Sequence, residues 1–183
     1  VGDHALVLSV AAGVTLAKLQ AGLAPAARVV RSMPNTPCLI GEGATAFSLG
    51  QHATPDDAAT AARLLGAVGA AYEVPEPLLD AVTGLSGSGP AYVYTVIEAL
   101  ADAGVREGLP AGIAADLAAR TVAGAAQMVR ETGEHPALLR SAVTSPGGTT
   151  AAGLAELDRC GLRHALHAAV RAATDKARQL GDD

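Results

Sequence analysis

The chain has no tryptophan, one phenylalanine, three tyrosines and two cysteines among its 183 residues. Half of the residues are apolar, but alanine dominates that half, so large side chains for filling a core are scarce. Because the distance between packed helices depends on the side chains at the contact, small residues let helices approach closely. The composition therefore indicates tight helix-on-helix packing, in a chain long enough for one large domain or two small ones.

Cysteine and histidine are too sparse to suggest a disulfide framework or a metal centre. Cys38 and Cys160 stand alone, which favours reduced thiols and a cytoplasmic protein. The five histidines are scattered along the sequence: His4, His52, His135, His164 and His167. The last two are three residues apart and share a helix face, but no third ligand accompanies them, so we expect no metal.

Charge and hydropathy exclude two further classes of partner. Lys18 and Lys176 are the only lysines, the net charge is −5, and no basic stripe is present, so we expect no nucleic-acid partner. No apolar run approaches the roughly 20 residues needed to cross a bilayer, and no signal peptide opens the chain. We therefore expect no association with a membrane.

Short apolar runs alternate with helical segments up to about residue 75. The segment Thr54-Pro55-Asp56-Asp57 combines a cap, a first-turn proline and two acids, which indicates a helix start. Strand–helix alternation of this kind predicts an α/β sheet. The predicted strands are 5–10, 28–32, 44–49 and 71–74, and the predicted helices are 15–23 and 55–67.

No strand pattern follows Pro77, and the second half is predicted to be all-α. Helices lined with alanine and glycine can hardly close a core alone, so we expect them to interdigitate with a second copy of the chain. A monomeric bundle is the alternative. The predicted helices are 88–107, 110–130, 135–143, 151–157 and 162–180.

The loop Val143–Thr150 stands out between two of these helices. Pro146 lacks an N–H group, and Gly147 and Gly148 allow backbone conformations closed to other residues. We expect Thr149 or Thr150 to cap the next helix. Free N–H groups at its start would suit a small anion such as a carboxylate, although an ordinary cap and turn would have the same sequence.

This loop, with three further stretches in the same order and spacing, resembles the pyrroline-5-carboxylate reductase family. The four stretches are Ala11–Thr15, Arg31–Pro37, Asp80–Tyr92 and Leu138–Leu154. The resemblance implies a partial Rossmann-type nucleotide-binding domain at 1–75, followed by an all-helical dimerisation and substrate-binding domain at 76–183. It also implies a homodimer, and a ring of such dimers as in some relatives.

The reaction implied by the resemblance is the reduction of 1-pyrroline-5-carboxylate to L-proline with NADPH or NADH. Small residues after the first strand and a stiff polar loop after the second would receive the nicotinamide end of the cofactor. Without a cofactor, the first segment would be an ordinary tight strand–helix turn and the second an ordinary polar turn, with the same sequences. The implied cofactor contacts are Val10, Ala11, Ala12, Pro34 and Asn35.

The implied substrate contacts gather at the loop already described. Ser145, Gly148, Thr149 and Thr150 would hold the carboxylate, and Thr150 would also be catalytic, relaying a proton near the imine nitrogen. Thr83, with hydroxyls and free N–H groups of residues 86–89, would face the imine ring at the start of the long helix. Glu76 matches a substrate position by its offset from Thr83; from the residues alone it is an exposed loop acid.

Two departures qualify the resemblance. Ala142 stands where some relatives have an asparagine near the substrate, which removes a hydrogen bond. No Gly-x-Gly-x-x-Gly turn follows a strand, and the glycines at 84, 87 and 89 have no apolar strand before them. We therefore expect the first half of the nucleotide domain to be absent, and we expect turnover to require that half. The preference for NADPH or NADH stays open.

Two other functions compete with this interpretation. A non-catalytic helical oligomerisation fragment of the same family would retain the helices without turnover. A β-hydroxyacid dehydrogenase would place a catalytic lysine on its long helix, and residues 88–107 contain none.

Overall fold

The structure is a computed structural model that describes residues 5–182, so His4 lies outside the described residues. Its contacts divide the chain into two compact units: Val1–Pro90 with His167–Asp183, and Ala91–Leu166. Helices α4 (Gly89–Arg106) and α8 (Leu162–Asp182) each run across this division. The domain boundary predicted between residues 75 and 76 stays a prediction, since a compact unit and a domain need not coincide.

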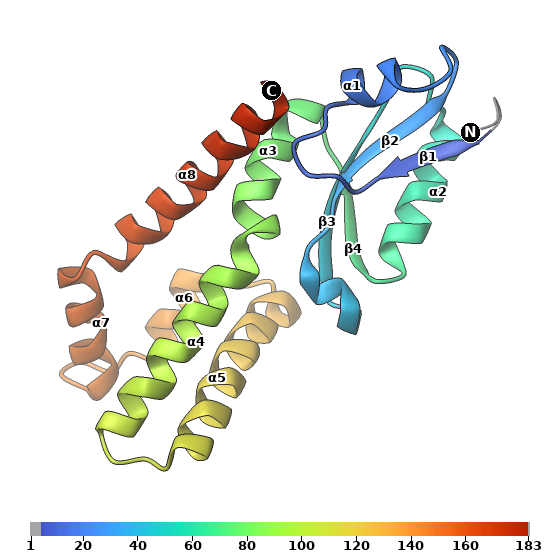
Figure 1. Ribbon diagram of the computed structural model, residues 1–183. Coiled ribbons are helices and arrows are strands. Elements are labelled where there is room, and N and C mark those ends of the chain that lie inside the picture. Colours follow the sequence, from blue (N-terminus) through green and yellow to red (C-terminus); the bar gives the residue numbers. More distant parts are fainter. Residues whose placement is uncertain (1–4, 183) are drawn as a thin grey trace. The chain divides into compact units, whose positions relative to one another are not determined.

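The first unit contains a four-stranded sheet in the order β1-β2-β3-β4, which confirms the predicted α/β class (Figure 1). β1 is parallel to β2, and β3 is parallel to β4. β2 and β3 are antiparallel because the short connection between them, the 3₁₀ helix η1, is no crossover. The elements are β1 (Leu6–Ser9), β2 (Arg28–Met33), η1 (Thr36–Ile40), β3 (Gly43–Leu49) and β4 (Gly69–Glu73).

Helices cover both faces of the sheet. α2 (Pro55–Gly66) packs on one face, where Val30 and Phe47 meet Ala61 and Leu65. α1 (Leu16–Ala21) and α3 (Leu79–Val82) lie against the other face, which carries Val29 and Arg31. The side chains of β2 alternate between these faces, as they do along any strand.

Short helical turns precede the predicted long helix. A 3₁₀ turn, η2 (Glu76–Leu78), leads into α3, and a π-helical turn, η3 (Thr83–Gly87), joins α3 to α4. The Ser88 N–H donates to the Thr83 carbonyl at 2.8 Å, the wider pairing of a π turn. The predicted start of the long helix at Ser88 is confirmed within one residue, because α4 begins at Gly89, whereas the helical turns from residue 76 to residue 87 were not predicted.

The last helix packs back on the first unit. A Cβ added at Gly84 in the π turn would collide with the side chain of Thr174 on α8. Gly13, with φ of 74°, lies against Leu180 in the same way. The C-terminal part of α8 thus contacts both the π turn and the loop after β1, at two glycines whose missing side chains make room for it.

Helices alone make up the second unit, in agreement with the all-α part predicted after Pro77. α5 (Ala111–Thr132), α6 (Pro136–Ala142) and α7 (Thr149–Arg159) join most of α4 and the first residues of α8. Gly104 of α4 lies against Ala114 of α5, so small residues bring these two helices together. Large apolar side chains on α4 and α5 remain exposed in the single chain: Val93, Tyr94, Leu100, Val105, Ile113, Leu117 and Met128.

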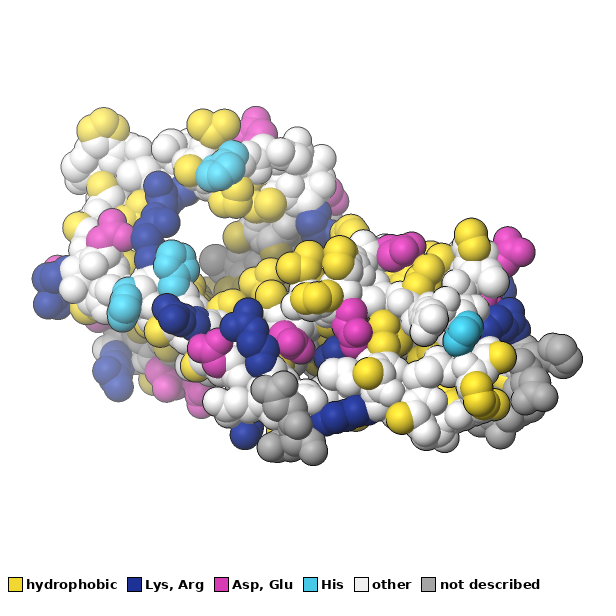
Figure 2. Space-filling view, turned by 90° about the horizontal axis from the view of Figure 1, so that it is seen from above, with side chains coloured by type: hydrophobic (Ala, Val, Ile, Leu, Met, Phe, Trp, Pro, Cys, Tyr) yellow, Lys and Arg dark blue, Asp and Glu magenta, His cyan; other side chains and the backbone are white. Residues whose placement is uncertain are grey.

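The surface carries mixed charge and many apolar side chains. Figure 2 shows Lys and Arg interspersed with Asp and Glu, and apolar groups lying open between them. Within residues 5–182, no helix combines the length and apolar character of a membrane span. In the same described range, no three His, Cys, Asp or Glu side chains gather as metal ligands would. Cys38 and Cys160 are both free thiols.

Candidate functional site

The first part of the candidate site lies where β1 and β2 end. Because these strands are parallel and Ser9 pairs with Arg31, their carboxyl ends meet at one edge of the sheet. The Ser32 hydroxyl donates to the Ser9 carbonyl at 2.8 Å and ties the two strand ends together. The structure thus brings both predicted cofactor-binding segments, Val10–Ala12 and Pro34–Asn35, to the same edge.

The loop after β1 presents small, open side chains. Val10, Ala11 and Ala12 are exposed. The Ala11 N–H donates to the Ser9 hydroxyl at 3.3 Å, and the positive φ of Gly13 turns the chain toward α1. The tight strand–helix turn is therefore present, and it leaves an open surface where a flat ring can approach the backbone.

Asn35 has a structural partner that the sequence did not predict. Its side-chain oxygen accepts the Ala44 N–H at 2.9 Å, and its carbonyl accepts the Cys38 N–H at 3.1 Å. These bonds orient the amide, so its oxygen faces the start of β3. The NH₂ group donates to no acceptor among the described residues. Asn35 was predicted to offer both a donor and an acceptor to a carboxamide. Because its side-chain oxygen accepts from Ala44, the NH₂ group is the part that can bind a carboxamide.

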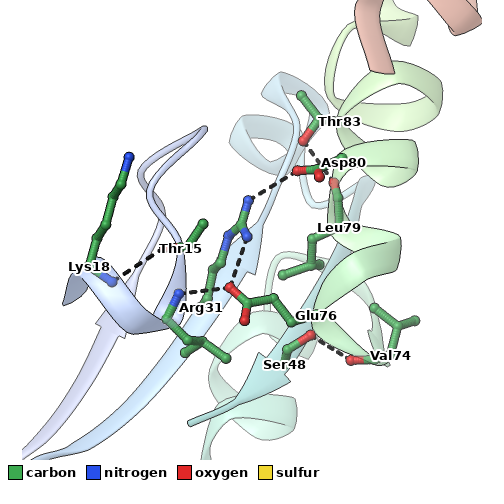
Figure 3. Close-up of polar contacts among 10 residues, drawn as sticks. Thr15, Lys18, Arg31, Ser48, Val74, Glu76, Leu79, Asp80 and Thr83 are labelled. Atoms are coloured by element: carbon green, nitrogen blue, oxygen red, sulfur yellow. Dashed lines mark hydrogen bonds and ion pairs between the residues drawn. The ribbon is translucent and has the colours of Figure 1, made fainter. Parts of the chain in front are cut away.

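Glu76 is part of an ion-pair network (Figure 3). Its Oε1 accepts from Arg31 Nη1 at 3.0 Å and from the Leu16 N–H at 2.7 Å. Arg31 Nη2 reaches Asp80 Oδ1 at 3.4 Å. The Arg31 side chain is 7% exposed and that of Glu76 is 29% exposed. The interpretation of Glu76 as an exposed loop acid is therefore wrong, because its carboxylate is the partner of a buried arginine.

Arg31 and Asp80 were missed as members of the candidate site. A signal was available, since Arg31 directly follows Val29 and Val30 in a predicted strand. Arginine is almost never fully buried unless it is paired, so its position called for a carboxylate partner. Which carboxylates would serve was not evident, because residues 76 and 80 are distant in sequence.

The π turn engages the polar groups that were expected to be free. The Thr83 hydroxyl donates to the Leu79 carbonyl at 2.8 Å, and the Ser86 hydroxyl donates to the Val82 carbonyl at 3.1 Å. Among the N–H groups expected to be free at this helix start, that of Ser88 donates to the Thr83 carbonyl. The Thr83 oxygen retains acceptor capacity for a ligand.

A separate set of predicted ligand contacts lies in the second unit. Gly147 has φ of 69°, and the Gly148 N–H donates to the Ser145 carbonyl at 3.1 Å. Gly148 is the N-cap of α7, and a Cβ there would collide with the Ser145 hydroxyl. The expected capping by Thr149 or Thr150 is wrong, because these are the first two residues of the helix and no side chain caps it.

This arrangement leaves backbone donors unpaired at the start of α7. The Ala152 N–H donates to the Gly148 carbonyl at 3.2 Å, whereas the N–H groups of Thr149, Thr150 and Ala151 meet no acceptor among the described residues. The Ser145 and Thr149 side chains are exposed and Thr150 is half-buried. Three free amides at the positive end of an 11-residue helix, with hydroxyls beside them, can hold an anion.

Residues 76–180 match a family described as pyrroline-5-carboxylate reductase dimerisation. Among curated proteins, a pyrroline-5-carboxylate reductase of Synechocystis is 52% identical over 98% of this chain and 67% of its own length. One of Arabidopsis thaliana is 52% identical over 96% of this chain and 63% of its own length.

Solved structures agree with these matches. A Coxiella burnetii pyrroline-5-carboxylate reductase has a TM-score of 0.91 at 39% identity and covers 96% of this chain and 65% of its own. A Plasmodium falciparum pyrroline carboxylate reductase with NADP bound has a TM-score of 0.90 at 34% identity and covers 96% and 67%. The chain thus spans about two thirds of the length of the relatives it matches.

Proposed function

The chain belongs to the pyrroline-5-carboxylate reductase family, and we propose that it serves the NAD(P)H-dependent reduction of 1-pyrroline-5-carboxylate to L-proline. The observation that carries this proposal is the start of α7, where three amides without acceptors among the described residues stand beside the hydroxyls of Ser145, Thr149 and Thr150. A small carboxylic acid is the kind of ligand that such a corner binds.

The strand edge of the first unit fits the nicotinamide end of the cofactor. Val10, Ala11 and Ala12 are small or open enough for a ring and ribose to approach, and the Asn35 NH₂ group can donate to a carboxamide oxygen. When bound, the nicotinamide supplies the hydride. The sequence has no Gly-x-Gly-x-x-Gly turn after a strand, so these residues fit that end of the cofactor alone. NADPH and NADH are both compatible with them.

For the substrate, the proposal divides the polar groups by their chemistry. The N–H groups of Thr149 and Thr150 bind the carboxylate, and Ser145 and the backbone of Gly148 complete the corner. The Thr150 hydroxyl lies near the imine nitrogen and holds the proton that this nitrogen carries. Thr83, through its hydroxyl oxygen, remains a proposed substrate contact, whereas one carboxylate oxygen of Glu76, the other predicted contact, already accepts from Arg31 and from the Leu16 N–H.

The proposed assembly is a homodimer through the helices of the second unit. In the single chain these helices leave Val93, Ile113 and Leu117 exposed, which is the surface that a second copy would cover. A ring of such dimers is a further proposal by analogy with relatives. Free thiols at Cys38 and Cys160 suit a reducing compartment, and we place the protein in the cytoplasm.

Turnover tests the proposal directly. NADPH oxidation in the presence of 1-pyrroline-5-carboxylate is measured for the chain and for a longer version that carries the preceding segment of a relative. We expect turnover by the longer version and loss of most of it in the chain alone. Thr150→Ala in the longer version should lower kcat/KM by about 1–2 kcal/mol of transition-state stabilisation, the scale of one polar contact.

A matched control is Thr132→Ala, which removes an exposed threonine whose hydroxyl donates to the Met128 carbonyl in α5. This variant should keep the kcat/KM of the parent. An unchanged value for Thr150→Ala would remove Thr150 from the site. A longer version without any turnover would favour the oligomerisation fragment instead.

A further inference from the structure

We propose that Arg31 is a positioning residue. Its guanidinium fixes the relative positions of three segments of the first unit that carry candidate ligand contacts: the loop after β1, the loop after β2 and the π turn. This inference rests on the proposed function for its catalytic consequence, whereas its structural part can be tested without any ligand. It also reassigns Glu76, which acts through α1 and Arg31 rather than by touching the substrate.

The geometry of the network connects separate parts of the sequence through one side chain. Arg31 pairs with Ser9 across the sheet, level with the end of β1. Its own strand leads into Pro34 and Asn35, three and four residues further on. Nη1 binds Glu76 at 3.0 Å and Nη2 binds Asp80 at 3.4 Å, so the planar fork spans both carboxylates (Figure 3).

The Glu76 branch fixes the loop after β1. Its Oε1 also accepts the N–H of Leu16, the first residue of α1, at 2.7 Å. α1 has only six residues, none of them buried. A cavity of about 440 Å³ is lined by α1, by Leu49–Gln51 and by Glu76. Since no residue of α1 is buried, the polar contact with Glu76 helps to fix where this short helix begins, and the contact of Gly13 with Leu180 of α8 fixes the loop before it as well.

The Asp80 branch fixes the π turn. Asp80 lies in α3, directly after Leu79, which is fully buried against the sheet and whose carbonyl accepts the Thr83 hydroxyl. Holding Asp80 therefore sets the rotation of α3 and the place of Thr83 one turn later. Lysine in place of Arg31 would keep the charge but lose the planar fork, whose two terminal nitrogens face the two carboxylates separately.

The first experiment follows hydrogen exchange in the chain without ligands. Arg31→Lys should raise exchange several-fold in residues 10–16 and in residues 79–88, whereas Asp80→Asn should raise it in 79–88 alone. Arg28→Lys is the matched control, because Arg28 lies on the opposite face of β2 and binds Asp57 of α2 at 2.8 Å. It should leave both segments at the exchange rates of the unchanged protein. Unchanged exchange in both segments of Arg31→Lys would overturn the proposal.

The second experiment uses the longer, active version and separates positioning from simple loss of structure. Misplacing a cofactor-binding loop by about 1 Å can cost on the order of 100-fold in rate. Arg31→Lys should therefore lower kcat by about 10- to 100-fold, whereas the dissociation constant for L-proline, measured by calorimetry, should change less than about twofold. Glu76→Gln combined with Arg31→Lys should cost no more than the larger single effect, since both act through one network.

The outcomes of the two experiments are distinguishable. If the unchanged longer version neither turns over nor binds proline, the proposed function fails, and the exchange data still decide the role of Arg31. If it is active and Arg31→Lys keeps its kcat, the positioning role is refuted. Additive losses in the double variant would instead return Glu76 to direct contact with the substrate.

Discussion

Arg28 and Arg31 lie on one strand, three residues apart, and point to opposite faces of the sheet. Arg28 binds Asp57 at the start of α2, and Arg31 binds Glu76 and Asp80 on the other side. Each arginine thus joins β2 to the layer that covers its face. For each charged side chain, its partner thus decides whether that side chain joins parts of the fold or stays available to a ligand.

Asp57 should make stability depend on pH. Asp57 is 3% exposed. The hydrogen bond from the backbone N–H of Thr54 lowers the pKa of its carboxyl most, and burial raises it. The Thr54 hydroxyl and Arg28 lower the pKa further. The folded pKa thus lies below the unfolded value of about 3.9, so the contribution is complete above that value and is lost as pH falls through the folded pKa. We expect Asp57→Asn to cost about 1–2 kcal/mol of unfolding free energy near neutral pH.

Urea unfolding of both proteins at about pH 7 and at about pH 3 checks this expectation, since the difference should shrink at the lower pH. Asp56→Asn is the matched control, because its exposed neighbouring carboxyl lies in the same first turn. Its effect should stay within about 0.5 kcal/mol. A difference for Asp57→Asn that grows on acidification would contradict the assignment.

Elements with regular periodicity could be predicted from the sequence, and the junction before α4 could not. The strands and most helices appear where their apolar spacing places them, and the Thr54 cap is present as expected. Pro90 and its neighbouring glycines suggested a helix start, because proline suits a first turn. α4 does begin there, at Gly89, but the chain before it is already helical and passes through a π turn, in which Gly84 fits against Thr174 of α8. The two residues of that contact are far apart in the sequence, so local sequence patterns cannot predict it.

The same reason explains which parts of the candidate site could be predicted. The glycines at 147 and 148 have local consequences, so an anion-binding loop was predictable. The engagement of Asn35 by Ala44 and of Glu76 by Arg31 and Leu16 depends on pairing across the sheet, which spacing alone does not reveal.

For the whole molecule, the helices of the second unit leave apolar side chains without cover. Such exposure is costly in water and fits the match to a dimerisation family. A small-residue composition predicted helices that need a second copy. The surface that the copy would occupy became visible only with the structure.

We expect a dimer in solution, with a melting temperature that rises with protein concentration. Leu117→Glu should weaken it, because a charge on the apolar face of α5 opposes burial; light scattering would then report the mass of one chain or an unfolded protein. Leu64→Glu on α2 is the matched control, since Leu64 is 49% exposed and Leu117 is 50% exposed. A monomer in the unchanged protein, or a stable dimer in Leu117→Glu, would count against this surface.

Binding of a carboxylate at the start of α7 can be followed by titrating isotope-labelled protein with L-proline and recording its backbone amide resonances. We expect saturable shifts of the Thr149, Thr150 and Ala151 amides, because these N–H groups meet no other acceptor within residues 5–182. Acetate should shift the same amides more weakly, and prolinamide, which lacks the carboxylate, should not shift them. Saturation elsewhere in the chain with these three amides unmoved would contradict the account.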